Sequence, residues 1–239
     1  MKKTAIILGG GSGLRAGGEI PKQFQDINGK PMLWWSIEAF YKEDSSVEII
    51  VVLHPEYFEL WNKLTAKIPK DEYISHVIVC GGRSRWHSVY NGLLNIKPEI
   101  DSYVAIHDGA RPLISTEMIH RGWVAAKCYQ AAIPVVPLTD SIRKKNNDTD
   151  SITVNRSDYI AVQTPQVFDS TLIKQAYTMP DDPRFTDPDG KFGIPPFTDD
   201  ASVVESINHH ISLYDGNANN IKVTNPIDFA IAEILMNNR

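Results

Sequence analysis

Short apolar runs alternate with amphipathic segments along the first half of the chain. The run at residues 5–8 is continuous and ends in glycines, which is typical of a buried strand in a parallel sheet. Further strands are predicted at residues 47–53, 77–80, 104–106 and 131–136, and helices at 31–40, 55–68, 84–96 and 116–128. This order predicts an α/β, Rossmann-like fold with a mostly parallel sheet and helices on both faces. Ligands bind such sheets at the carboxyl ends of the strands.

The alternation stops at about residues 138–160, where polar residues surround a turn-forming Asn-Asn-Asp-Thr-Asp sequence. The flanking segments can pair as strands, so we expect a hairpin arm that extends from a single domain of residues 1–239 and needs a partner surface. Residues 179–197 are rich in Pro, Asp and Gly and are predicted to form a surface loop. The chain is expected to close with a helix at 200–206, a strand at 211–214 and a helix after Pro226.

Composition narrows the class of protein. The chain has 239 residues, 42% hydrophobic and 22% charged, which suits one sizeable soluble domain. A net charge of −5 disfavours nucleic-acid binding, which needs a basic surface. No stretch approaches the roughly 20 apolar residues that span a bilayer, and the N-terminal apolar run is too short for a signal peptide, so we expect no membrane contact and a cytoplasmic location. Cys80 and Cys128 are predicted to be buried free thiols, because their spacing does not suit a zinc site.

A glycine-rich loop directly follows the first strand, and its glycines are Gly9, Gly10, Gly11 and Gly13. Glycines let a backbone approach a phosphate closely and let successive N–H groups point at it. The loop lacks the Gly-Lys-Ser/Thr ending of a P-loop. Instead, Arg15 and Lys22 place two cations nearby, which suits charge stabilisation at a reacting phosphate. The alternative is a glycine turn that serves packing alone.

A second polar cluster, His107-Asp108-Gly109-Ala110-Arg111-Pro112, follows the strand predicted at 104–106. Asp108 is a candidate ligand for Mg²⁺, which prefers carboxylates together with substrate phosphates. Arg111 is expected either to pair with Asp108 or to hold a phosphate in bidentate fashion. A structural Asp–Arg pair that ends the strand is the alternative. His107 is predicted to be a packed strand-end residue rather than a base.

Eight motifs occur along residues 5–228 in one order, namely G-G-G-S-G-x-R, P-K-Q-F, G-K-P-M-L, G-G-x-x-R-x-x-S-V-x-N-G-L, H-D-G-A-R-P, Q-T-P-Q-V-F, T-D-D-A-S-V-V-E and N-I-K-V-T-N-P-x-D. Together they resemble the 2-C-methyl-D-erythritol 4-phosphate cytidylyltransferase family. The resemblance implies a nucleotide-diphospho-sugar transferase-like fold. It also implies an enzyme of the non-mevalonate isoprenoid pathway that transfers CMP from CTP to methylerythritol phosphate, with Mg²⁺ as cofactor, and that forms a homodimer through the arm.

The resemblance also implies roles for residues on the CTP side. Arg15 and Lys22 would stabilise the transition state at the α-phosphate, and Lys222 would add positive charge near the phosphates and help to position the attacking group. Gly82 and Ser88 would read the cytosine, because a few backbone and hydroxyl hydrogen bonds in a close-fitting site distinguish a pyrimidine edge.

On the acceptor side, Ser141, Arg156 and Thr164 match positions that hold the methylerythritol phosphate, and Arg156 is counted with the catalytic residues. Because the family's arm crosses to a second subunit, this pocket would be shared between protomers. Thr198 also matches a substrate-side threonine. A helix N-cap is the alternative role for Thr198.

The chain departs from the family pattern in a few places. Its first loop begins Gly9-Gly10 where Ala-Ala is common, Ala16 replaces a usual Met, Gly109 replaces an Ala, and Ser141 replaces a Thr. The segment at 179–197 is longer than typical. No change removes a charged catalytic position, but the longer segment could alter the substrate side.

The implied mechanism is an in-line displacement in which the acceptor's phosphate oxygen attacks the α-phosphorus of CTP without a general base. A ribitol 5-phosphate cytidylyltransferase is the close alternative, with the same CTP site and a linear acceptor. A non-catalytic nucleotide-binding protein is a further alternative, although it predicts loss of Arg15 and Lys22, and both are present.

Overall fold

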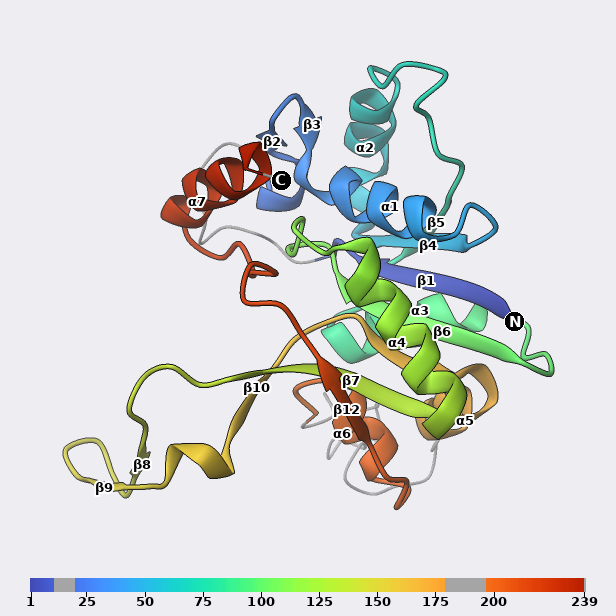
Figure 1. The fold of residues 1–239 in the computed structure, drawn as a ribbon. Helices are drawn as coiled ribbons and strands as arrows, with labels where there is room; N and C mark the ends of the chain where they lie inside the picture. Colours follow the sequence, from blue (N-terminus) through green and yellow to red (C-terminus); the bar gives the residue numbers. More distant parts are fainter. Residues whose placement is uncertain (11–19, 179–196, 239) are drawn as a thin grey trace, which may run out of the picture.

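The computed structural model describes residues 1–10, 20–178 and 197–238. Its central sheet has eight strands (Figure 1). Four of them form a parallel half in which β1 lies between β6 and β4, and β5 forms the edge beyond β4. These strands are β1 (Lys2–Leu8), β4 (Glu48–Leu53), β5 (Val77–Cys80) and β6 (Ser102–Asp108). The predicted parallel core is confirmed.

The other half of the sheet contains antiparallel strands that the sequence pattern did not reveal. β11 (Gln166–Asp169) runs antiparallel between β6 and β7 (Ala131–Pro137), and β10 (Ile160–Val162) also pairs antiparallel with β7. β12 (Ser212–Asp215) is parallel to β7. β10 and β11 have only three and four residues, too few for an apolar pattern to show.

Helices cover both faces of the sheet, as predicted. One face carries α1 (Met32–Glu43), α2 (Phe58–Thr65) and α4 (Thr116–Tyr129). The opposite face carries α3 (Arg85–Leu94), α5 (Ser170–Tyr177) and α6 (Asp200–Glu205). Successive strand residues point to opposite faces, so Ile7 packs in the first core cluster and Ile6 in the second. The helix predicted at 55–68 is shorter, because a 3-10 turn, η3 (Pro55–Tyr57), precedes α2.

A third, smaller apolar cluster joins distant parts of the chain beside the strand ends. It contains residues of the short hairpin β2 (Asp26–Ile27) and β3 (Lys30–Pro31) and of the C-terminal helix α7 (Pro226–Asn237). Val223, just before α7, is fully buried in this cluster. The packing brings the segment around Lys222 next to the 3-10 turn η2 (Lys22–Phe24).

The predicted hairpin arm is present and projects away from the sheet (Figure 1). β8 (Arg143–Lys145) and β9 (Ser151–Thr153) pair with each other in a separate two-stranded sheet. The 3-10 turn η4 (Arg156–Asp158) leads back toward β10. The exposed apolar side chains of this region include Ile152, Tyr159 and Ile160.

Three further expectations can be compared with the structure. The prediction that both cysteines are buried is wrong, since Cys80 ends the edge strand β5 and Cys128 lies on the exposed side of α4. Their apolar neighbours do not reveal which strand forms a sheet edge. The loop predicted at 179–197 lies, apart from Phe197, outside the described residues. Within the described chain, every helix is too short or too polar to cross a membrane.

Candidate active site

The carboxyl ends of the parallel strands surround a cavity of about 980 Å³, a size that suits a nucleotide. Seven predicted site residues line it together, although they come from five separate segments of the chain. They are Gly9, Gly10, Lys22, Gly82, Ser88, Asp108 and Lys222. The strand register explains the convergence at the centre, because Leu8 at the end of β1 is the partner of Asp108 at the end of β6.

The loop between β5 and α3 is shaped by close contacts. A Cβ at Gly82 would lie 2.3 Å from Cβ of His87 and 3.0 Å from its backbone carbon, so only glycine fits there. The Ser88 hydroxyl accepts a hydrogen bond from Gly82 N at 3.1 Å and donates to Ser84 O at 3.0 Å. Its proton is therefore engaged, while one acceptor position remains for a ligand.

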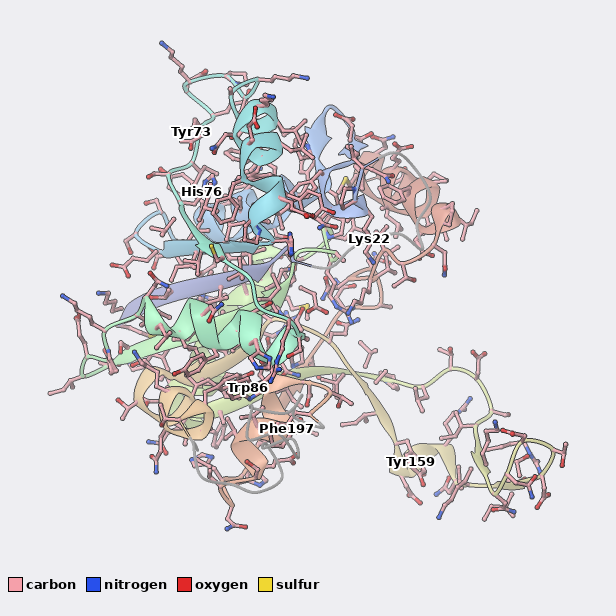
Figure 2. All side chains as sticks on the ribbon, turned by 180° about the vertical axis from the view of Figure 1, so that it is seen from behind. Lys22, Tyr73, His76, Trp86, Tyr159 and Phe197 are labelled. Atoms are coloured by element: carbon pink, nitrogen blue, oxygen red, sulfur yellow. The ribbon has the colours of Figure 1, made fainter. Side chains whose placement is uncertain are left out.

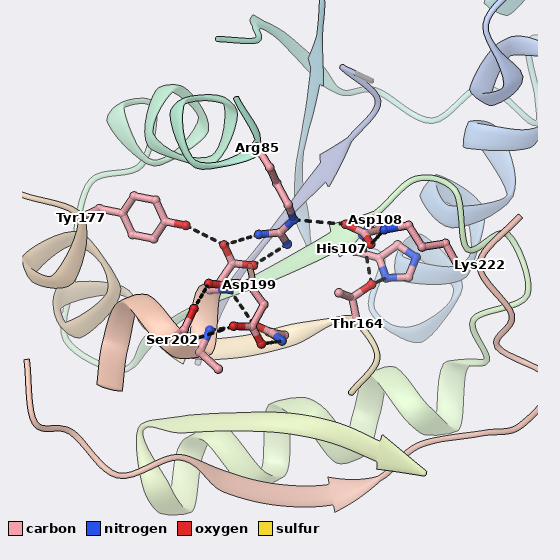
Figure 3. A network of polar contacts seen from close by, with 11 residues as sticks. Arg85, His107, Asp108, Thr164, Tyr177, Asp199, Ser202 and Lys222 are labelled. Atoms are coloured by element: carbon pink, nitrogen blue, oxygen red, sulfur yellow. Dashed lines mark hydrogen bonds and ion pairs between the residues drawn. The ribbon is translucent and has the colours of Figure 1, made fainter. Parts of the chain in front are cut away.

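Asp108 is the centre of charge in the cavity, and its contacts are drawn in Figure 3. Its Oδ2 lies 2.7 Å from Nζ of Lys222, and its Oδ1 lies 3.5 Å from Nε of Arg85. Burial opposes the charged form of Asp108, but the charges of Arg85 and Lys222 outweigh it and hold the pKa of this carboxyl well below its usual range. Asp108 therefore stays ionised at neutral pH.

Arg85 connects the cavity to a buried carboxylate behind it. Its Nη1 and Nη2 donate to the two carboxylate oxygens of Asp200 at 2.9 and 2.6 Å, and the Asp200 side chain is 0% exposed. Tyr177 donates its hydroxyl to Asp200 Oδ1 at 2.6 Å. Burial alone would lower the pKa of Arg85, and the charge of Asp200 reverses the shift and raises it. Sequence reasoning gave Arg85 and Asp200 no role, although both stand in quoted motifs, G-G-x-x-R and T-D-D-A.

Two neighbouring side chains join the η2 turn to the cavity wall. Lys22 donates from Nζ to the carbonyl of Val223 at 2.7 Å, and the buried Gln23 donates from Nε2 to the carbonyl of Gly9 at 2.7 Å. Lys22 and Lys222 are thereby held on the same side of the cavity. Gln23 is a further residue that sequence reasoning missed, although it belongs to the P-K-Q-F motif.

His107, Thr164 and Arg111 support the strand ends from behind the cavity wall. His107 is 0% exposed, which confirms that it is a packed residue, and burial lowers its pKa to about 4. The Thr164 hydroxyl is buried between His107 Nδ1 and the backbone N–H of Asp108, at 3.1 Å from each. Arg111 donates from Nη1 to the carbonyl of Asn220 at 2.7 Å. The alternative of a strand-ending Asp–Arg pair is therefore wrong, because Asp108 pairs with Lys222 and Arg85.

The remaining predicted residues are not brought to the cavity of their own chain. Ser141 and Arg156 are exposed on the arm, where Arg156 donates to the carbonyl of Thr139. Thr198 is exposed, and its alternative role as helix N-cap is wrong, because Asp199 caps α6 by accepting from Ser202 N at 3.0 Å. Three predicted residues, Gly11, Gly13 and Arg15, lie outside the described residues.

The carboxylate at the cavity suits a metal ion that is bound mainly by the phosphates of a substrate and only in part by the protein. Among the described residues, no three His, Cys, Asp or Glu side chains gather in a group that could hold a metal. The ionised carboxylate of Asp108 nevertheless faces the cavity. Mg²⁺ is commonly bound by one or two carboxylates together with substrate phosphates, so Asp108 fits this kind of site.

Comparison with known proteins agrees with this geometry. Residues 4–238 match the family model described as IspD, 2-C-methyl-D-erythritol 4-phosphate cytidylyltransferase. Curated relatives with the same name include those of Phocaeicola vulgatus, 44% identical over 99% of this chain and 100% of that one, and of Bacteroides fragilis, 43% identical with the same coverage. The crystal structure of the Thermus thermophilus enzyme of this name superposes with a TM-score of 0.73 at 27% identity, covering 99% of this chain and 100% of that one.

A second solved structure, the 4-diphosphocytidyl-2C-methyl-D-erythritol synthase of Anaerococcus prevotii, reaches a TM-score of 0.78 at 25% identity and covers 99% of this chain and 98% of that one. These matches extend over nearly the whole chain, including the strand ends that build the cavity. The chain is a nucleotidyltransferase and belongs to the 2-C-methyl-D-erythritol 4-phosphate cytidylyltransferase family.

Proposed function

We propose that the cavity transfers CMP from CTP to 2-C-methyl-D-erythritol 4-phosphate, giving 4-diphosphocytidyl-2-C-methyl-D-erythritol and pyrophosphate. The observation that carries this function is the charge arrangement at the strand ends. Lys22, Lys222 and the ionised Asp108 line one cavity that has a glycine-rich wall, and Lys222 pairs with Asp108. Such a site is built to bind and neutralise phosphates rather than to abstract a proton.

Cytosine binds beside Gly82 and Ser88. The Ser88 proton is used by the carbonyl of Ser84, so the hydroxyl oxygen is left to accept a hydrogen bond. The exocyclic amino group of cytosine is a donor and suits this oxygen, whereas uracil has a carbonyl at the same position and would face it with a second acceptor. This contact favours CTP over UTP.

The reaction is an in-line displacement at the α-phosphorus of CTP. A phosphate oxygen of the acceptor, already anionic at neutral pH, forms the new P–O bond while the bond to the bridging oxygen of the β-phosphate breaks, and the electron pair leaves with pyrophosphate. Lys22 and Lys222 stabilise the charge on the phosphates during this step, and Arg15, which lies outside the described residues, is assigned the same role. No base is required, and the packed, neutral His107 is consistent with that.

Magnesium is the proposed cofactor, held by Asp108 and the phosphates of the nucleotide. When bound, the ion neutralises phosphate charge and keeps the triphosphate in one orientation. Asp108 contributes a carboxylate that its cationic neighbours keep ionised. Lys222 pairs with the same carboxylate, so Asp108 holds the Lys222 ammonium group close to the proposed magnesium site.

The acceptor pocket is proposed to form only in a homodimer. Arg156 and Ser141 are exposed on the arm and do not line the cavity of their own chain. The arm also exposes Ile152, Tyr159 and Ile160, apolar surface that a second copy would cover. An arm that crosses to the neighbouring copy brings Arg156 and Ser141 to its cavity, where Arg156 binds the acceptor phosphate. Thr198 is also proposed to lie on the acceptor side. A cytoplasmic location stays a prediction from the sequence.

The decisive measurement is pyrophosphate release from purified protein with CTP and Mg²⁺. Methylerythritol 4-phosphate is expected to support turnover, and ribitol 5-phosphate and UTP serve as controls that are expected to be poor substrates. A preference for ribitol 5-phosphate would overturn the acceptor but keep the CTP site. No release with either acceptor, under conditions where the fold is intact by circular dichroism, would contradict the proposed function.

A further inference from the structure

Four residues behind the cavity form a closed ring of hydrogen bonds. His107 Nε2 lies 3.2 Å from the carbonyl of Arg111, and His107 Nδ1 lies 3.1 Å from the hydroxyl of Thr164. The Asn220 amide donates to the carbonyl of Thr164 at 3.0 Å, and Arg111 Nη1 donates to the carbonyl of Asn220 at 2.7 Å, which closes the ring. The members come from the end of β6, the loop after it, the segment between β10 and β11, and the segment before α7.

Two residues with proposed roles in the reaction, Asp108 and Lys222, are connected to this ring by the chain and by hydrogen bonds. Asp108 follows His107 in the chain, and its backbone N–H donates to the Thr164 hydroxyl at 3.1 Å. Lys222 lies two residues after Asn220 and reaches Asp108 at 2.7 Å. Figure 3 shows Thr164 and His107 beneath Asp108, on the side away from Arg85. The ring therefore sets the separation between the two chain segments that carry Asp108 and Lys222.

Lys22, the third residue with a proposed role in the reaction, is connected to the same segment through Val223. Val223 donates its N–H to the carbonyl of Ala110 at 2.8 Å and accepts from Lys22 Nζ at 2.7 Å. A shift of the segment before α7 would therefore move Lys22 and Lys222 together, relative to Asp108.

Direct substrate contact does not explain the ring. None of its four members is among the described residues that line the cavity. His107 and Asn220 are 0% exposed and Thr164 is 6% exposed. Thr164 in particular cannot turn its hydroxyl toward a ligand without breaking the contacts to Asp108 and His107.

We propose that His107, Arg111, Thr164 and Asn220 are positioning residues, which act on the reaction by holding Asp108, Lys222 and Lys22 at fixed separations. The inference rests on the proposed function of the cavity. It replaces the roles expected for Thr164 and Arg111 as direct substrate ligands.

The donor and acceptor pattern makes Thr164 the residue to test. A carbonyl cannot donate, so His107 Nε2 carries the proton toward Arg111 O, and its Nδ1 accepts from the Thr164 hydroxyl. That hydroxyl in turn accepts from the N–H of Asp108. Valine has the shape of threonine but cannot make either bond, whereas serine can make both. Thr164→Val and Thr164→Ser therefore form a matched pair.

The experiment measures kcat and the KM for methylerythritol 4-phosphate in both variants, together with the melting temperature. Thr164→Val is expected to lower kcat by about 10- to 100-fold, the loss typical of a misplaced reacting group, with KM within about threefold of wild type. Thr164→Ser is expected to recover most of that loss. Asn220→Ala, which removes the other side-chain bond to Thr164, is expected to show the same kcat-selective loss.

A double-mutant cycle identifies the group through which Thr164 acts. In the Asp108→Ala background, Thr164→Val is expected to lower kcat by clearly less than it does in wild type, since one of the three groups that the ring positions is gone. Full additivity would overturn the proposal, and so would a rise in KM with kcat retained, which is the signature of direct acceptor binding. A lower melting temperature with unchanged kcat would show a purely structural role.

The activity of the wild-type protein distinguishes failure of the positioning proposal from failure of the proposed function. If wild type releases no pyrophosphate with either polyol phosphate, the proposed function fails before the ring is tested. If wild type is active and Thr164→Val keeps its kcat, the cavity function stands and the positioning ring is wrong.

Discussion

The cavity at the strand ends and the hairpin arm hold their polar side chains in opposite ways. At the cavity, Arg85 pairs with the fully buried Asp200 across 115 residues of sequence, and Lys222 reaches Asp108 across 114. On the arm, Arg143 bonds to Ser151 and Thr153, only 8 and 10 residues away, and all its contacts are exposed. The cavity is held by contacts between distant segments, and the arm by contacts within one hairpin.

This difference indicates which groups are ready to react in a single chain. Among the described cavity residues, ion pairs set the separations of Arg85, Asp108 and Lys222, so this part of the proposed CTP site is held by the fold of one chain. The arm residues Ser141 and Arg156 have only local support and lie in solvent. Their proposed role therefore depends on a second copy that supplies the missing surroundings.

The largest effect is expected from breaking the buried pair. Arg85→Met leaves the buried carboxylate of Asp200 without its cationic partner, which is expected to lower the free energy of unfolding by about 3–5 kcal/mol. Arg143→Met on the arm removes the same kind of group from an exposed site and is expected to change it by less than about 0.5 kcal/mol. Urea denaturation of both variants checks the contrast, and equal losses would contradict it.

Removing a cavity cation is expected to affect rate rather than stability. Lys22→Ala should lower kcat by about 10²- to 10³-fold, as for other groups that stabilise charge in a transition state. Lys145→Ala, on the arm, is the matched control and should keep kcat within about twofold. Steady-state pyrophosphate release measures both. Near-normal turnover of Lys22→Ala would remove Lys22 from the proposed mechanism.

Mixing two inactive variants tests whether the arm acts on the neighbouring copy. Arg156→Ala removes a residue proposed to bind the acceptor phosphate, and Lys222→Ala removes a residue proposed to stabilise the phosphates of CTP. If Arg156 acts in the partner's cavity, refolding the two together restores about a quarter of wild-type turnover, because about half of the dimers are mixed and one of their two cavities is intact. If Arg156 acts within its own chain, no mixed dimer has an intact cavity and turnover stays at the level of the single variants.

The smallest effect concerns a contact far from both regions. The Trp61 indole donates to His76 Nε2 at 2.9 Å, and burial lowers the pKa of His76. Figure 2 shows His76 and Tyr73 on the segment that runs beside α2. Because the folded-state pKa lies below the unfolded value of about 6.5, the unfolded state binds more protons as pH falls below 6.5, and stability is lost there. His76 alone is expected to contribute at most about 1.4 kcal/mol per pH unit to this slope.

Urea denaturation between pH 5 and 8 measures this slope. His76→Gln, which cannot titrate, is expected to reduce the slope but not to abolish it, because the buried His107, whose pKa is lowered to about 4, loses stability in the same direction. The kcat of His76→Gln at neutral pH should match wild type, since His76 is not among the described residues that line the cavity. A pH profile unchanged by the substitution would assign the titration to another group.

The sequence alone determined the parallel core and most of the cavity. Apolar runs that end in Gly or Asp, such as residues 5–9 and 104–108, are typical of buried strands in a parallel sheet, and the carboxyl ends of such strands meet at one edge. Asp108, at the end of such a strand, was predicted from this pattern, whereas Gly82, Ser88 and Lys222 were indicated by the family resemblance, and all four line the cavity. The hairpin arm was also predictable, because a turn-forming polar segment between two strand-like segments permits few other structures.

Only the tertiary structure decided which side chains hold these groups in place. The pairing of Arg85 with Asp200 and the bonds of Thr164 to Asp108 and His107 join residues that are 56 to 115 positions apart in the sequence. The exposure of Cys80 follows from the position of β5 at the sheet edge, which depends on strand order. Sequence periodicity reports how each segment meets the core, whereas partners across the sheet depend on the packing of the whole chain.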